Sequence, residues 1–199
     1  MNPPASYVRA LEVDGAYGGR IRMPLFSRVE KLFVECGLVG LHDGYHLIPF
    51  GELAGSLKSL RVDCLCGTPH SQVFGLIHSL PGLEDLTLSG NDKTIEQDRS
   101  LDIFPPSTPI ALTGALGLCL RNIGKSIRLL LDLQGGLHFK KLTLRSRCTE
   151  ENFPLVEKLL KACSDTLECL DIECTIENGT LDSVSLFDQT LTGIFKINP

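Results

Sequence analysis

The chain lacks the features that mark nucleic-acid binders and membrane proteins. It has 199 residues, no tryptophan, 6% aromatic residues and a net charge of −5 at pH 7. A general nucleic-acid binder needs a basic surface, which this composition does not supply. No apolar run approaches the ~18 residues that span a bilayer. The first residues show no basic leader before an apolar core, so we expect no signal peptide and a cytoplasmic or nuclear location.

The cysteines and histidines of the sequence predict neither disulfides nor a standard zinc site. The eight cysteines are expected to be free thiols, because disulfides are rare in reducing compartments. Zinc is an alternative, and the candidate ligand groups are Cys64, Cys66 and His70, and Cys163, Cys169 and Cys174. Their spacings match no standard pair of zinc hooks. The simpler interpretation is structural, because a buried free cysteine behaves as a small hydrophobe.

No catalytic constellation stands out. The five histidines are scattered and have no partnered nucleophile, and no hydrolase or metalloprotease signature is present. Gly124-Lys125-Ser126 resembles the end of a phosphate-binding loop, but that loop needs a glycine where this chain has Cys119. A nucleotide-binding domain is therefore a weak alternative. We predict no enzymatic activity and no cofactor.

What the chain does have is a repeated pattern of an apolar residue, two variable positions, an apolar residue, one variable position and an apolar residue. The seven copies are Val8-Leu11-Val13, Val29-Leu32-Val34, Leu57-Leu60-Val62, Leu83-Leu86-Leu88, Ala115-Leu118-Leu120, Phe139-Leu142-Leu144 and Leu167-Leu170-Ile172. Their central leucines are 21, 28, 26, 32, 24 and 28 residues apart. This spacing predicts an α/β leucine-rich-repeat solenoid, a horseshoe arc whose parallel strands line the concave side.

The segments between copies are expected to close each turn on the convex side. Apolar stripes at helical spacing predict helices over 71–80, 122–131 and 155–163. Glycines between elements, at Gly90, Gly114, Gly135 and Gly136, suit turns with positive φ. Residues 91–114 carry three prolines and several polar residues, which indicates an irregular insertion loop.

Residues 1–199 are expected to form a single domain of about seven repeats. Neither end resembles a polar cap, which indicates a fragment of a longer product. A weak further copy at Leu181-Val184-Leu186 and an edge strand over 194–197 are also expected.

Outward strand positions are the predicted binding surface, because they project from a rigid sheet at fixed spacing. Arg121, Lys141 and Arg145 are expected to lie on adjacent strands, about 5 Å apart, as one basic strip. A mixed-charge face that serves solubility alone is the alternative, and the insertion loop is the next candidate site. The predicted partner-binding residues are Arg61, Arg121, Lys141, Thr143, Arg145, Asp171 and Glu173.

Four segments extend the pattern beyond generic repeats. They are LEDLTLSG at 83–90, PPSTP leading into LTG over 105–114, LLLDL through GLHFKKL over 129–142, and CSDTLECLD at 163–171. Together they resemble a family of mushroom-type fungal leucine-rich-repeat proteins, many of which carry an F-box-like segment upstream.

The resemblance implies a non-catalytic protein-recognition module, the substrate-binding part of an F-box-type ubiquitin-ligase receptor. No F-box-like helical segment precedes the first repeat in this sequence, so a Skp1-type adaptor is an expected partner only if the full product carries an F-box. A stand-alone scaffold with no ligase link is the alternative. The target on the concave face is an unknown protein, and neither a nucleic acid nor a membrane is expected.

Overall fold

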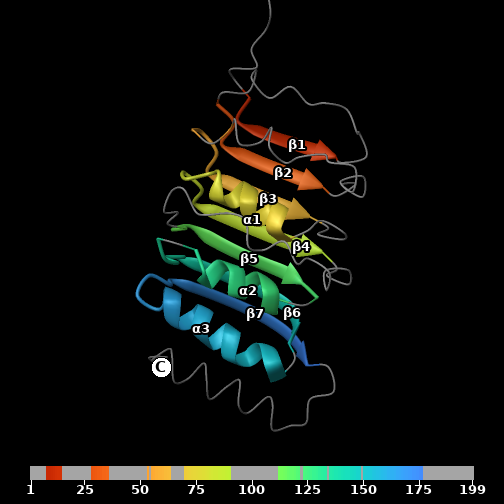
Figure 1. Ribbon diagram of the computed structural model, residues 1–199, viewed down its shortest axis with the longest axis vertical. Helices are drawn as coiled ribbons and strands as arrows, with labels where there is room; N and C mark the ends of the chain where they lie inside the picture. Colours follow the sequence, from red (N-terminus) through yellow and green to blue (C-terminus); the bar gives the residue numbers. More distant parts are fainter. Residues whose placement is uncertain are drawn as a thin grey trace, which may run out of the picture.

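The chain forms an α/β structure around one parallel sheet. The computed structural model describes residues 8–14, 28–35, 53, 55–63, 70–90, 112–121, 123–133, 135–148 and 150–176. The seven strands lie side by side in the order of the sequence (Figure 1). They are β1 (Ala10–Asp14), β2 (Lys31–Glu35), β3 (Ser59–Asp63), β4 (Asp85–Gly90), β5 (Ala115–Leu120), β6 (Lys141–Cys148) and β7 (Cys169–Ile176). The predicted α/β class and parallel sheet are confirmed.

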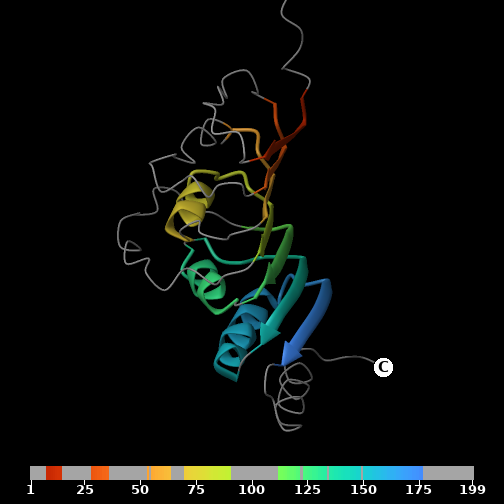
Figure 2. The same ribbon diagram turned by 90° about the vertical axis from the view of Figure 1, so that its right-hand side faces the viewer.

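The described helices cover one face of this sheet (Figure 2). They are α1 (His70–His78), α2 (Gly124–Leu131) and α3 (Phe153–Cys163), with a 3-10 turn η6 (Glu150–Asn152) before the last. All three lie where the apolar stripes predicted helices. The third begins two residues early, with a proline in its first turn, where a missing N–H leaves no helical bond unmade.

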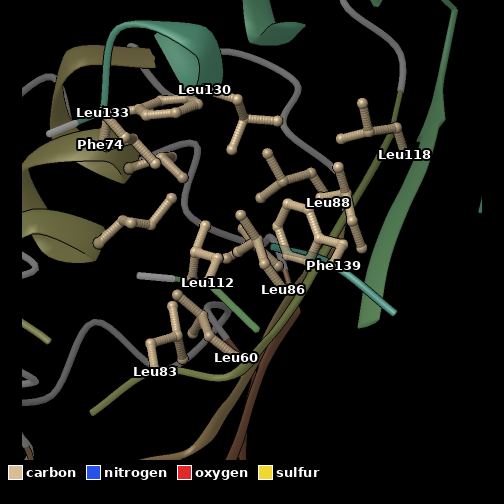
Figure 3. Packing of buried hydrophobic residues seen from close by; sticks show 14 of the residues in the cluster. Leu60, Phe74, Leu83, Leu86, Leu88, Leu112, Leu118, Leu130, Leu133 and Phe139 are labelled. Atoms are coloured by element: carbon tan, nitrogen blue, oxygen red, sulfur yellow. The ribbon is translucent and has the colours of Figure 1, made fainter. Parts of the chain in front are cut away.

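Strand residues alternate between the core and the opposite face. In β2 the central positions Leu32 and Val34 are buried while Lys31 and Glu35 are exposed. Because of this period of two, every second side chain lies on the face of the sheet that the helices cover. The core then fills the layer between strands and helices, where Leu86, Leu88 and Leu118 face Phe74 and Leu130 (Figure 3). Burying each such side chain contributes about 1.5–3 kcal/mol.

The fifth strand is the place where the predicted register is wrong. Leu116, and not Leu118, stands beside Leu86 and Leu142. The pattern failed here because the buried residue before the strand is Leu112, while Thr113 is exposed. Three positions therefore separate the buried Leu112 from the buried Leu116, where the repeat pattern has two. The predicted copy, Ala115-Leu118-Leu120, was for this reason placed two residues too late. Since the slip is an even number, the buried face was still predicted correctly.

Successive turns repeat one backbone arrangement. The carbonyl oxygen just before a strand accepts hydrogen bonds of 2.8–3.3 Å from two consecutive N–H groups at the start of the next strand, and the acceptors are Arg9, Glu30, Lys58, Gly114 and Lys140. Apart from Gly114, the residues just before the strands alternate in sign, and three neighbouring pairs of them form ion pairs. The ion pairs are Arg9–Glu30 at 2.6 Å, Lys58–Glu84 at 3.4 Å and Lys140–Glu168 at 3.9 Å.

A second repeated detail links the third and seventh strands. The hydroxyl of Ser56, three residues before β3, donates to the carbonyl of Val29 at 2.8 Å. The hydroxyl of Thr166, three residues before β7, donates to the carbonyl of Phe139 at 3.1 Å. Both acceptors lie two residues before the preceding strand. The same kind of side-chain hydrogen bond thus joins a turn to the preceding turn at two distant places in the sheet.

The glycine predictions are partly confirmed. Gly90, Gly135 and Gly136 have φ values of 137°, 117° and 80°, the region that side-chain-bearing residues avoid. Gly114 does not belong to this group. It is needed for space, because a Cβ there would overlap the Asp85 carboxylate and meet the carbonyl oxygen of Glu84 at 3.0 Å.

Several predictions fall outside the described residues. These are most of the insertion, at 91–111, the further copy at 181–186, and the edge strand at 194–197. The last residues of the predicted loop, 112–114, are described: Leu112 forms a parallel bridge with Leu137 and accepts a hydrogen bond from the N–H of His138 at 2.9 Å. Among the helices that are described, none is long and apolar enough to cross a membrane.

Candidate partner-binding face

The sheet presents a second face, opposite the helices, which we call the polar face (Figure 2). Its side chains come from alternate strand positions and lie in register across the strands. The first row is Ala10, Lys31, Ser59, Asp85, Ala115, Lys141 and Cys169. The middle row is Glu12, Phe33, Arg61, Thr87, Gly117, Thr143 and Asp171, and the last is Glu35, Asp63, Ser89, Cys119, Arg145 and Glu173.

The centre of the polar face consists of short side chains. On β4 and β5 these are Thr87, Ser89, Ala115, Gly117 and Cys119, all half-buried. Asp85, also half-buried, begins β4, and its carboxylate accepts a hydrogen bond from the N–H of Ala115. A Cβ on residue 117 would meet Thr87 Oγ1 at 3.1 Å and Cγ2 at 3.2 Å, so the threonine occupies the room that the glycine leaves. The Ser89 hydroxyl oxygen is buried and has no hydrogen-bond partner among the described residues.

A charged cluster borders this centre on the β3 side. Arg61 pairs with Asp63 on the same strand, with 2.8 Å between Nη2 and Oδ2. Its guanidinium carbon also lies 4.9 Å from the centroid of the Phe33 ring on β2. A cation over an aromatic face contributes about 0.5–1 kcal/mol at an exposed site. Arg61 is therefore held in place from two sides.

A second charged cluster borders the centre on the β6 side. Arg145 lies between two carboxylates of β7, at 3.4 Å from Asp171 and 3.6 Å from Glu173. The side chain of Arg145 is 57% exposed, and exposed ion pairs stabilise a fold by no more than about 1 kcal/mol. These contacts fix the position of Arg145 more than they stabilise the sheet.

The predicted site residues come together on the polar face with one exception. Arg61, Lys141, Thr143, Arg145, Asp171 and Glu173 all lie on it, in the rows given above. Arg121 follows the end of β5, and by register it stands beside position 147 and not beside Arg145. Lys141 and Arg145 share one strand, about 13 Å apart. The three basic residues thus do not form the single strip across the strands that the misplaced fifth copy predicted.

Two of the described cysteines, Cys119 on the polar face and Cys163 in the core, have thiols of low reactivity. Burial raises the pKa of the Cys119 thiol, and Arg145 and Arg61 oppose this shift only in part. Burial also raises the pKa of Cys163, which packs in the core. Both groups are therefore protonated at neutral pH, and neither is poised as a nucleophile.

The arrangement of the described residues does not support the nucleotide-binding alternative or the zinc alternative. Gly124 and Ser126 are buried at the start of α2. No group of three or more metal-ligating side chains occurs among those described. Cys163 is buried while Cys169 is exposed on the polar face. The other proposed zinc ligands, Cys64, Cys66, and the side chains of His70 and Cys174, lie outside the described part.

Phe33 and Cys119, like Glu12 and Glu35, lie on the face but were not among the predicted partner-binding residues. Both occupied outward positions of their repeats, and Phe33 precedes Arg61 by one strand in the same row. An aromatic residue at an outward position beside an arginine is the signal that could have identified the pair.

No protein-family model, curated protein or solved structure matches the chain. The partner-binding surface is therefore inferred from the geometry of the polar face.

Proposed function

We propose that the chain is a non-catalytic protein-recognition module, a leucine-rich-repeat solenoid that binds its partner on the polar face. Support for the repeat assignment comes from equivalence between turns. Strands β2 to β6 bury side chains at matching positions, the equivalent Leu11 and Leu170 of the edge strands are half-buried, and the same carbonyl column joins successive turns. Ser56 and Thr166 make the same bond at equivalent places. Arrays of this kind are stabilised by contacts between neighbouring turns.

One observation carries the binding proposal: short side chains form the centre of the face, and charged clusters flank them. The centre extends over β4 and β5, between Arg61 on β3 and Lys141 and Arg145 on β6. Adjacent strands lie about 4.8 Å apart, so the flanking residues stand about 14 Å apart across the sheet. This width admits a polypeptide segment, and the flanking charges can select its sequence.

The rigidity of the sheet favours binding. The side chains of the face project from strands that are hydrogen-bonded on both sides in β2 to β6. Arg61 and Arg145 are already oriented by their own ion pairs. Less conformational entropy is then lost when a partner docks, which leaves more of the contact energy as affinity.

The proposed biological role is the substrate-binding part of an F-box-type ubiquitin-ligase receptor. This role is supported by the family resemblance of four segments. A stand-alone scaffold is the second candidate. Affinity capture with the full-length product separates them: recovery of the F-box-binding ligase adaptor supports the receptor, and recovery of partners without it supports the scaffold.

The binding proposal is tested by charge reversal on the polar face. We expect Lys141→Glu with Arg145→Glu to abolish capture of the partner from native extract, and to leave thermal unfolding almost unchanged. The matched control is Arg128→Glu with Lys158→Glu, which makes the same change of charge on exposed positions of α2 and α3. Undiminished capture by the face variant would place the site elsewhere.

A further inference from the structure

The charges of the polar face divide into paired and unpaired groups. Arg61 is neutralised by Asp63, and Arg145 by Asp171 and Glu173. Within the described part of the chain, Glu12, Lys31, Glu35, Asp85 and Lys141 make no ion pair. Asp85 is half-buried, and its carboxylate already accepts a hydrogen bond from the N–H of Ala115. The other four are exposed. A partner gains most from groups whose charge is not already satisfied.

These unpaired charges have opposite signs at opposite corners of the face. Glu12 and Glu35 lie on neighbouring strands at the β1–β2 side, about 8 Å apart by one strand spacing and two residues. Lys31 also lies there, at the far end of β2 from Glu35, so two carboxylates stand against one ammonium group. Lys141 lies at the start of β6, beside Ala115 and Cys169. The face therefore has a negative corner and a positive corner.

The path between the corners crosses the short side chains. Lys141 is four strands from Glu35 and at the other end of the strand. Four strand spacings and four residues give a diagonal of about 23 Å, which about seven extended residues span. The diagonal crosses β3 between Arg61 and Asp63, which are already paired with each other. It then passes over Thr87 and between Ala115 and Gly117, where the side chains are short.

We propose that the partner contributes an extended segment with a basic side chain at one end and an acidic one about seven residues away. The basic side chain lies between Glu12 and Glu35, and the acidic one lies on Lys141. Small or polar residues between them lie over Thr87 and Gly117. This inference rests on the proposed function, because it names the chemistry of the partner for the same face.

A second copy of this chain suits the face less well. Both edge strands carry carboxylates on it, Glu12 on β1, and Asp171 and Glu173 on β7. Edge-to-edge pairing of two copies would bring these like charges together. Like charges side by side suppress a contact, so these edges disfavour self-association.

A selection with displayed peptides tests the inference directly. A library of random peptides, each long enough to span the face, is selected against the full chain, and the enriched sequences are compared with the unselected library. We expect enrichment of basic–acidic pairs at a separation of about seven residues. Two variants of the face are then compared, Lys141→Glu and the double variant Glu12→Lys with Glu35→Lys. Each variant should bind the best peptide with about tenfold lower affinity than the unchanged chain.

The controls are Arg128→Glu and Glu151→Lys, which reverse exposed charges outside the polar face and should leave the affinity unchanged. Three results would overturn the inference: no enriched peptide, enriched peptides without the charge pair, or binding that survives both face reversals. If the inference fails and Lys141→Glu with Arg145→Glu still abolishes native capture, the proposed function stands. If that capture survives as well, the proposed function falls too.

Discussion

Asp85 accepts a hydrogen bond of 2.7 Å from the backbone N–H of Ala115 through its carboxylate Oδ1. At the corresponding place in other described turns, the acceptor is the backbone carbonyl before the strand. Glu84 supplies that carbonyl here, but it accepts only from Gly114, at 3.0 Å. The side chain of Asp85 thus replaces a backbone acceptor at the turn where the repeat spacing slips.

Gly114→Ala should therefore destabilise the fold. The added methyl group would overlap the Asp85 carboxylate, so either this hydrogen bond or the backbone must shift. We expect a loss of about 1–3 kcal/mol in the free energy of unfolding, measured in urea. Gly55→Ala is the matched control, because a Cβ there meets nothing within 4 Å. Equal stability of Gly114→Ala and wild type would contradict this assignment.

The hydroxyls of Ser56 and Thr166 should contribute similarly to stability. Each donates to a carbonyl of the preceding turn, and such a bond is worth about 1 kcal/mol net. Ser56→Ala and Thr166→Val should each lower the midpoint of chemical unfolding by a matching amount. The exposed Thr113→Val is the control. A large effect at one site and none at the other would argue against equivalent turns.

The corrected register of β5 predicts different costs at adjacent positions. Leu116 is 1% exposed and stands beside Leu86 and Leu142, so Leu116→Ala should cost about 2–5 kcal/mol. Ala115 is half-buried on the polar face, so Ala115→Ser should change stability by less than about 0.5 kcal/mol. Thermal unfolding of both variants checks this. A severe effect of Ala115→Ser would favour the register in which Ala115 is a core position.

Alkylation should distinguish three cysteines by burial. Cys169 is exposed, Cys119 half-buried and Cys163 buried, and burial raises the pKa of the last two. Because the thiolate is the reactive form, the raised pKa keeps Cys119 mostly protonated at neutral pH, and its rate should rise steeply only at alkaline pH. Peptide-level mass spectrometry should show the order Cys169, Cys119, Cys163. Fastest labelling of Cys163 would mean that its turn is not packed as described.

The raised pKa of Cys163 also sets a direction for stability. The Cys163 thiol binds its proton more tightly in the folded state than in the unfolded state. Its contribution to the free energy of unfolding is therefore fully present at pH values below the pKa that the thiol has in the unfolded chain. It is lost as the pH rises through the folded pKa. The free energy of unfolding should therefore fall at alkaline pH, and less so in Cys163→Ala when each variant is compared with its own value at neutral pH.

Much of the architecture could be predicted because burial imposes a period of two on the strands. Leu86 and Leu142 matched the repeat pattern and lie on the predicted strands. The fifth turn could not be placed as well, since its buried residue is Leu112, one position before the usual place. A sequence pattern fixes which residues need burial, but the way a chain enters a strand depends on bonds such as that from Ala115 to Asp85.

The candidate site was predictable only as a set of outward positions. Arg145 and Glu173 were both expected on the face, but the pairing of Arg145 with two carboxylates depends on register and side-chain geometry. The alternating charges before the strands, such as Lys140 and Glu168, follow from position alone. They would have been found by comparing the residue before each strand across all seven copies.

Lysine footprinting of the captured complex tests recognition by the polar face most directly. Lys141 lies on that face and Lys158 lies exposed on α3, on the other side of the sheet. Acetylation of free and partner-bound protein, followed by mass spectrometry, reports the accessibility of each amine. We expect strong protection of Lys141 and an unchanged rate at Lys158. Protection of Lys158 with Lys141 unaffected would contradict recognition by the polar face.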